Sequence, residues 1–142
     1  MAAALPLEKN LAYLSVLNQK NEPLYTLNNK DDKLSLDFQL MLFSSLDQFD
    51  IFRITGEATG GYLSSTNIGD DIYYSYGHVF GSRIKVVVIM ENIQLSERDK
   101  EEIKRVTSKI HELYINDRLN PLSTGLLPYS ESFVEQIQRF LN

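Results

Sequence analysis

Hydrophobic and polar positions in residues 33–52 repeat with the period of an α-helix, roughly 3.6 residues, but they form two apolar stripes rather than one. The broad stripe consists of Leu34, Phe38, Met41, Leu42, Leu46, Phe49 and Phe52. The narrow stripe consists of Leu36, Leu40, Phe43 and Ile51, with Asp47 among them. One stripe can face the core of the domain. The other therefore needs a second cover, either from this chain or from another protein.

Short apolar runs before and after this helix are typical of β-strands. We expect strands at residues 11–17, 24–27, 62–66, 72–80 and 83–90. The last strand is apolar throughout its second half, which places it in the middle of a sheet. Just before it, Gly81-Ser82 fits a two-residue hairpin turn with glycine in the first central position.

Two further helices are predicted after the strands. Residues 96–116 carry a single apolar stripe and a charged remainder, so this helix is expected to lie on the sheet with its other face in water. The segment from Ser96 to Asp99 resembles a capping box, and Asn120-Pro121 ends the helix. Ser130 or Ser132 then caps a short last helix with Phe133, Ile137, Phe140 and Leu141 on its apolar side.

The resulting order, β-β-α-β-β-β-α-α, predicts one α/β (α+β) domain over residues 11–142. We expect a five-stranded sheet of mixed topology, antiparallel in most pairs, because hairpins join most of its strands. Residues 33–52 should cover one face and the two later helices the other. Residues 1–10 are expected to form a flexible lead-in, since Pro6 opposes regular structure there.

Composition narrows the possible functions. The 142 residues carry a net charge of −5, which argues against nucleic acid or an anionic membrane surface as the main partner. There is no cysteine, which excludes disulfides, thiol nucleophiles and thiolate metal sites. No apolar run approaches the length of about 18 residues that suggests a membrane span, and the first residues do not resemble a secretory signal.

Candidate catalytic residues are lacking as well. His78 and His111 do not have the spacing of a metal site, and the glycine-rich residues 55–61 are not followed by the Lys-Ser/Thr of a phosphate-binding loop. Tyrosines at positions 62–76 could stack nucleobases, but with a net acidic chain we expect them to pack beneath a helix. The sequence therefore predicts no enzyme, with no catalytic, cofactor-binding or metal-binding residue.

The narrow stripe is the strongest functional signal. A carboxylate such as Asp47 is costly to bury without a partner, but it is tolerated at a surface where a donor from another protein can meet it. We therefore predict a partner-binding surface formed by Leu36, Leu40, Phe43, Asp47 and Ile51. The alternative is that loops or an N-terminal arm of this chain cover the stripe.

Four stretches also carry a family resemblance. They are the Phe-Ser-Ser-Leu-Asp sequence at 43–47, the tyrosine-rich strands at 61–90, Asn120-Pro121-Leu122, and the last helix with Phe133. In their order and spacing the sequence resembles the sedlin family of TRAPP complex subunits, in its subunit 2-like branch. Leu122 departs from the phenylalanine that is usual in the family, and the N-terminal extension is atypical.

This resemblance implies a longin or SNARE-like fold and a non-catalytic adaptor or assembly subunit of a vesicle tether in Golgi traffic. Its partners would be other TRAPP subunits and, indirectly, the Rab-type GTPase on which the complex promotes nucleotide exchange. Asp47 matches an acidic family position implicated in partner binding. Such a protein would be cytoplasmic and peripheral at Golgi membranes. Two alternatives stay open, a longin-type SNARE regulator and a PAS- or profilin-like module that binds a small ligand.

Overall fold

The computed structural model describes residues 11–30, 32–55, 60–91, 97–119 and 131–141. In chain order its elements are β1 (Leu11–Leu17), β2 (Pro23–Asn28), the 3₁₀ turn η1 (Asp32–Leu34), α2 (Ser35–Thr55), β3 (Gly60–Ile68), β4 (Asp71–Val79), β5 (Lys85–Glu91), α3 (Glu97–Leu119) and α4 (Glu131–Leu141). The predicted element order is confirmed. The expected lead-in at 1–10, the caps at Ser96 and Ser130, and Asn120-Pro121-Leu122 lie outside the described residues.

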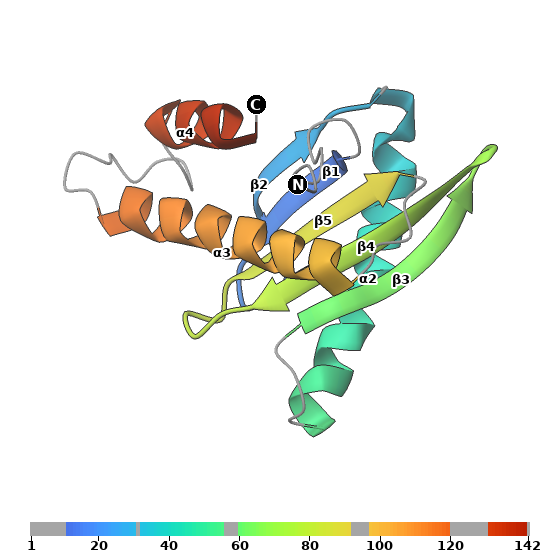
Figure 1. Cartoon of the computed structure of the whole chain (residues 1–142), viewed down its shortest axis with the longest axis horizontal. Helices are drawn as coiled ribbons and strands as arrows, with labels where there is room; N and C mark the ends of the chain where they lie inside the picture. Colours follow the sequence, from blue (N-terminus) through green and yellow to red (C-terminus); the bar gives the residue numbers. More distant parts are fainter. Residues whose placement is uncertain (1–10, 31, 56–59, 92–96, 120–130, 142) are drawn as a thin grey trace.

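The five strands form one sheet in the order β2-β1-β5-β4-β3 (Figure 1). All four pairings are antiparallel, so the expectation of a mixed sheet was wrong. The reason is that α2 carries the chain from one edge of the sheet to the other. The two strands that it joins, β2 and β3, therefore never pair. The central position predicted for β5 is confirmed.

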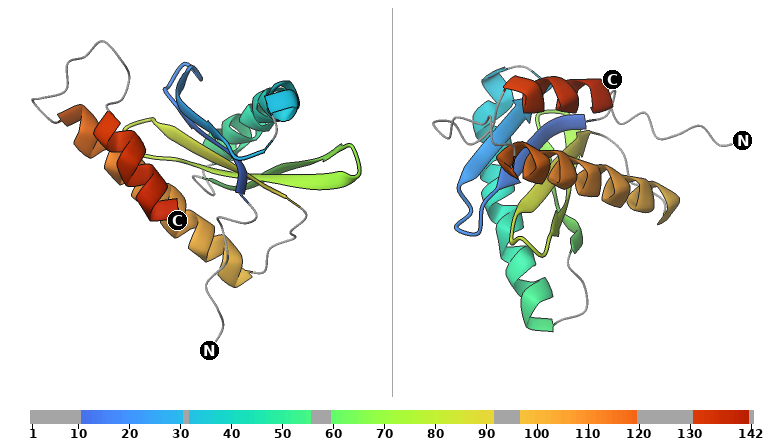
Figure 2. Two further views of the ribbon diagram at one scale, coloured as in Figure 1. Left: turned by 90° about the horizontal axis from the view of Figure 1, so that it is seen from above. Right: turned by 90° about the vertical axis from the view of Figure 1, so that its left-hand side faces the viewer.

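Helices cover the two faces as predicted. The α2 helix lies against one face, and α3 and α4 lie on the other (Figure 2). Central β5 serves both layers, because Val87 and Ile89 pack on the α2 side while Val86, Val88 and Met90 pack on the α3 side. Burial on both faces explains why this strand is apolar at every one of these positions.

Two tyrosines of β4 pack beneath the helices, as the sequence predicted. Tyr73 faces α2 and meets the ring of Phe38 edge-on, with 5.1 Å between the ring centroids. Tyr76 lies in the core beneath α3, and Tyr74 packs against that core while partly buried. The side chain of Tyr62 lies outside the described part of the chain.

Some predicted boundaries were wrong. The organising helix begins at Ser35 rather than at position 33, because residues 32–34 form the 3₁₀ turn, and it continues to Thr55. Gly81-Ser82 is not a two-residue hairpin turn. Instead, Phe80 pairs with Ile84 across a longer loop in which Arg83 has a φ of 69°. The two-residue turn lies at Gly69-Asp70, between the paired residues Ile68 and Asp71. Gly69 there has a φ of 64°, a conformation that favours glycine.

Candidate interaction surface on helix α2

The broad stripe of α2 anchors the helix to the sheet. Its buried members are Phe38, Met41, Leu42, Leu46 and Phe49, while Leu34 is partly buried and the side chain of Phe52 is not described. Phe38 is fully buried between Tyr13 and Tyr73. One side of the helix is thus committed to the core of the domain.

A buried cluster of three serines fixes how α2 lies on the β3–β4 hairpin. The Oγ atom of Ser45 lies 2.7 Å from Ser75 Oγ and 2.8 Å from Ser64 Oγ, and it donates to the carbonyl oxygen of Met41 at 2.8 Å. The Ser64 and Ser75 hydroxyls are 3.0 Å apart. Because these bonds are directional and Ser45 and Ser75 are fully buried, they restrict rotation of the helix about its axis.

A close approach between the helix and β4 also restricts rotation of α2 about its axis. A Cβ atom at Gly77 would lie 2.8 Å from Cζ of Phe49 and 3.0 Å from the carbonyl oxygen of Val86. Only glycine therefore lets the Phe49 ring lie directly on this strand. Together with the serine cluster, this contact determines which residues of α2 point away from the sheet.

The narrow stripe points away from it. Leu36, Leu40 and Phe43 are 64%, 59% and 53% exposed, and Asp47 is exposed beside them. The structure thus brings four of the five predicted residues together on the outward side of α2. The fifth, Ile51, belongs to the same helix, but its side chain lies outside the described residues.

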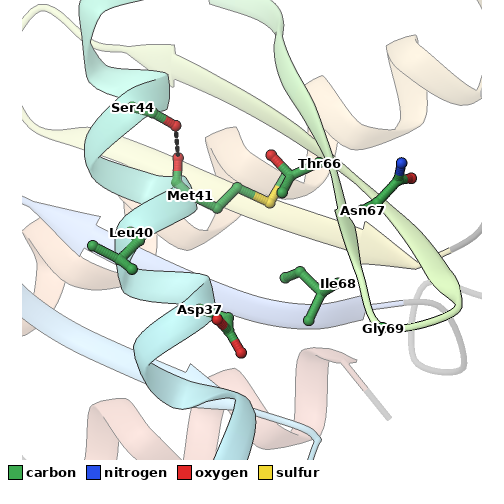
Figure 3. A pocket seen from close by; sticks show the side chains of 8 residues that line it. All are labelled: Asp37, Leu40, Met41, Ser44, Thr66, Asn67, Ile68 and Gly69. Carbon is green, nitrogen blue, oxygen red and sulfur yellow. Dashed lines mark hydrogen bonds between the residues drawn. The ribbon is translucent and has the colours of Figure 1, made fainter.

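An open groove of about 450 Å³ runs beside this stripe, between α2 and the β3–β4 turn (Figure 3). Its lining residues are Asp37, Leu40, Met41, Ser44, Thr66, Asn67, Ile68 and Gly69. Leu40 belongs both to the groove and to the narrow stripe, so the two features form one continuous surface. The sequence analysis did not find the groove, because the strand expected at 62–66 stops short of Asn67 and Ile68, whereas β3 continues to Ile68.

The two histidines serve packing elsewhere. Burial, with a further contribution from Lys104, lowers the pKa of His78 to about 4, and its Nδ1 lies 3.0 Å from the hydroxyl of Thr107 on α3. His111 stacks on Phe80 with 4.2 Å between the ring centroids, and burial lowers its pKa. Both rings therefore hold α3 against the sheet. Among the described residues, no group of three or more His, Cys, Asp or Glu side chains could hold a metal ion.

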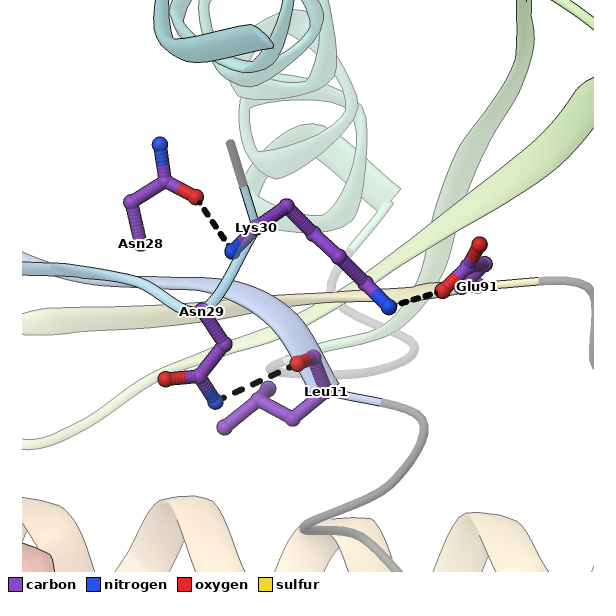
Figure 4. Close-up of polar contacts among 5 residues, drawn as sticks. All are labelled: Leu11, Asn28, Asn29, Lys30 and Glu91. Atoms are coloured by element: carbon purple, nitrogen blue, oxygen red, sulfur yellow. Dashed lines mark hydrogen bonds and ion pairs between the residues drawn. The ribbon is translucent and has the colours of Figure 1, made fainter. Parts of the chain in front are cut away.

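Polar contacts at the end of the sheet away from the two histidines fix the segment that leads into α2 (Figure 4). Asn29 donates from its side chain to the carbonyl oxygen of Leu11 at 3.2 Å, and Asn28 accepts from the backbone N–H of Lys30 at 2.9 Å. Lys30 also pairs with Glu91 at the end of β5. The start of α2 is thereby tied to two central strands.

In the part of the chain that the structure describes, no helix is long and apolar enough to cross a membrane.

Comparison with known proteins agrees with this architecture. The family model described as Sedlin matches residues 16–141, from within β1 to the end of α4. The chain belongs to the sedlin family. Its five-stranded antiparallel sheet between one helix and two later helices is the longin-type arrangement that the resemblance implied. The family expectation drawn from the four sequence stretches is confirmed.

Individual relatives are more distant. This sedlin-family chain is 29% identical over 113 residues to the trafficking protein particle complex subunit 2-like proteins of Mus musculus and Rattus norvegicus. Each match covers 76% of this chain and 79% of the relative. Among solved structures, Myxococcus xanthus MglB aligns with a TM-score of 0.47 and 16% identity, over 80% of this chain and 92% of that protein.

Proposed function

We propose that this sedlin-family chain is a non-catalytic adaptor and assembly subunit of a TRAPP-type vesicle tethering complex. Two observations support the proposal. The family model spans nearly all of the folded domain, and the two mammalian relatives are named as trafficking protein particle complex subunit 2-like proteins. Each relative is matched over most of its length, so the comparison concerns the whole domain rather than a shared fragment.

The exposed stripe on α2 is the structural observation that supports the proposal. An apolar patch ringed by polar groups is the usual appearance of an interaction site, and large side chains near its centre contribute most of the binding energy. Leu36, Leu40 and Phe43 form such a patch, with Gln39 and Ser44 exposed at its sides. Asp47 adds a carboxylate that a donor on a partner can meet without the penalty of permanent burial.

In this role the chain contributes surface rather than chemistry. Other TRAPP subunits occupy the α2 face, and the assembled complex promotes nucleotide exchange on a Rab-type GTPase in Golgi traffic. The chain reaches Golgi membranes peripherally, through the complex. In a cell fractionation experiment, the chain should therefore leave the membrane pellet when other subunits are depleted. Retention in the pellet after depletion would contradict this part of the proposal.

Affinity purification from cytosol with mass spectrometry tests the assignment. The wild-type chain should recover several TRAPP subunits, and Phe43→Ala should recover far fewer. Leu119→Ala is a matched control, because it also truncates an apolar side chain that is 76% exposed, but on α3. It should recover the same subunits as the wild type. Recovery of no TRAPP subunit by the wild-type chain would contradict the proposal.

A further inference from the structure

Among the described residues, the β3 edge of the sheet is open beyond the irregularity in its pairing at Tyr62–Ser64, because the register is regular from Ser64 to Ile68. In the described part of the chain β3 pairs with β4 alone, so its other side carries main-chain groups with no strand beside them. Natural edge strands are commonly protected by proline, charged side chains or a covering element. The sequence of β3, GGYLSSTNI, has neither proline nor a charged residue. The opposite edge strand, β2, begins with Pro23, and its Tyr25 packs against Phe133 of α4.

The hairpin register identifies the main-chain groups that face outward. Ile68 and Asp71 close a two-residue turn, and opposing residues of antiparallel strands alternate between hydrogen-bonded and non-bonded pairs. Counting back from the turn, Thr66 and Ser64 direct their N–H and C=O groups toward β4. The Ser64 N–H does donate to Ser75 Oγ, at 3.0 Å, and its C=O accepts from the same atom. The N–H and C=O groups of Ser65 and Asn67 consequently point away from the sheet.

The groove beside this edge has a chemical polarity. In Figure 3 Asp37 lies at the end of the groove near Ile68, while Met41 points toward Thr66 and Ser44 lies further along the helix. Asp37 is the one charged residue of the eight that line the groove, and it is exposed. It lies in the first turn of α2. One end of the groove thus suits a cation, and the other end suits an apolar or small side chain.

We propose that β3 accepts an extended segment of a partner protein as a sixth strand, with a Lys or Arg side chain in the groove beside Asp37. An apolar side chain two residues away points into the same groove, because alternate residues of a strand share one face. That side chain packs on Met41 beside Thr66. This inference rests on the proposed function, since it describes the segment that another subunit places beside α2.

The edge favours a strand over a helix as the occupant. The outward N–H and C=O groups of Ser65 and Asn67 can be satisfied by another strand, whereas a helix has used its own main-chain groups internally. Strand addition supplies affinity through these main-chain bonds, and the groove supplies selectivity through the side chain at Asp37. The groove is continuous with the exposed stripe through Leu40, so the same partner can cover both.

A phage-displayed library of short peptides, selected against the full chain, tests this proposal. The selected peptides should carry Lys or Arg two residues from an apolar residue. Asp37→Asn should weaken their binding about two- to fivefold, as expected for one partly exposed ion pair. Asp37→Lys should reverse the selection toward Asp or Glu. A selection that yields no peptides, or that is unchanged by Asp37→Lys, would contradict the proposal.

Amide hydrogen exchange on a complex with one selected synthetic peptide then tests the strand geometry. The N–H groups of Ser65 and Asn67 should exchange more slowly when the peptide is bound, whereas that of Thr66 should change little because it already faces β4. Ser65→Pro removes one outward donor and should weaken binding by roughly three- to tenfold. Ser65→Thr is the matched control, since it keeps the donor. Circular dichroism should show that both variants are folded. The exchange experiment uses the wild-type chain, so it tests the proposal even if Ser65→Pro does not fold.

Further outcomes separate this proposal from the proposed function. Peptides with helical periodicity, or self-association of the chain through β3 in sedimentation, would identify a different occupant and refute strand addition. TRAPP subunits recovered by the wild type and equally by Asp37→Lys would refute strand addition while leaving the proposed function intact. Strand-like peptides selected by a chain that recovers no TRAPP subunit would support strand addition alone.

Discussion

Helices α2 and α3 cover opposite faces of the same sheet, yet their outward sides differ in kind. The α3 helix buries Ile103, Val106 and Ile110 and presents mainly charged and polar side chains to water. The α2 helix buries a comparable stripe but presents Leu36 and Phe43 on its other side. The fold requires only the buried stripe of each helix. Exposed apolar residues on α2 are therefore not explained by folding, and we propose that they serve the binding of a partner.

The two stripes of α2 should differ most in their effect on stability. Phe38→Ala removes a ring that is fully buried between two tyrosines, so it should lower the free energy of unfolding by about 3–5 kcal/mol. Phe43→Ala makes the same truncation at an exposed position and should change it by about 0.5 kcal/mol or less. Urea denaturation measures both. Equal losses would show that the stripes do not divide into core and surface.

The serine cluster should be the next most sensitive feature. Ser75→Ala removes the hydroxyl that lies within hydrogen-bond distance of both Ser45 and Ser64, leaving buried polar atoms with fewer partners. We expect a loss of about 1–3 kcal/mol of stability. Ser65→Ala on the exposed side of the same hairpin is the control and should be nearly neutral. A neutral Ser75→Ala would mean that the cluster does not hold α2 in place.

The α3 side should respond to pH through His78. Because burial lowers the pKa of His78 to about 4 from 6.5, the unfolded chain binds a proton more readily than the folded chain between these values. The stability that the neutral His78 contributes is therefore fully present above pH 6.5 and is lost as the pH falls toward 4. Thermal melts of the wild type and His78→Gln should converge toward acidic pH, with His78→Gln losing less of its stability in this window. Parallel pH profiles would contradict the buried, neutral imidazole.

Much of the fold could be predicted because its signals are local and periodic. The strand at Leu11–Leu17 and the placement of β5 follow from continuous apolar runs, and the division of α2 follows from its helical period. Turn assignments were harder. The sequence predicted the two-residue turn at Gly81-Ser82, whereas the strand register shows that Gly69 occupies such a turn.

The candidate surface was only partly predictable, for a related reason. Helical periodicity alone brings Leu36, Leu40 and Phe43 onto one side of α2. The groove needs in addition the neighbouring β3, whose length and edge position depend on pairing with β4 over the whole hairpin. By sequence alone Asp37 is an ordinary polar residue of the helix, and only the structure shows that it lines the same groove as Ile68. Long-range pairing of this kind leaves no short motif in the sequence.

Asp47→Ala provides the most direct test of the central claim that the exposed side of α2 binds a partner. The measurement pairs the melting temperature of the variant with its recovery of TRAPP subunits by quantitative affinity purification, alongside Leu42→Ala as the core control. Leu42→Ala should lower stability by about 2–5 kcal/mol because its side chain is buried. Asp47→Ala should melt like the wild type, since its carboxylate is exposed, and recover fewer subunits. An Asp47→Ala chain that unfolds, or that melts normally and recovers every subunit, would contradict the claim.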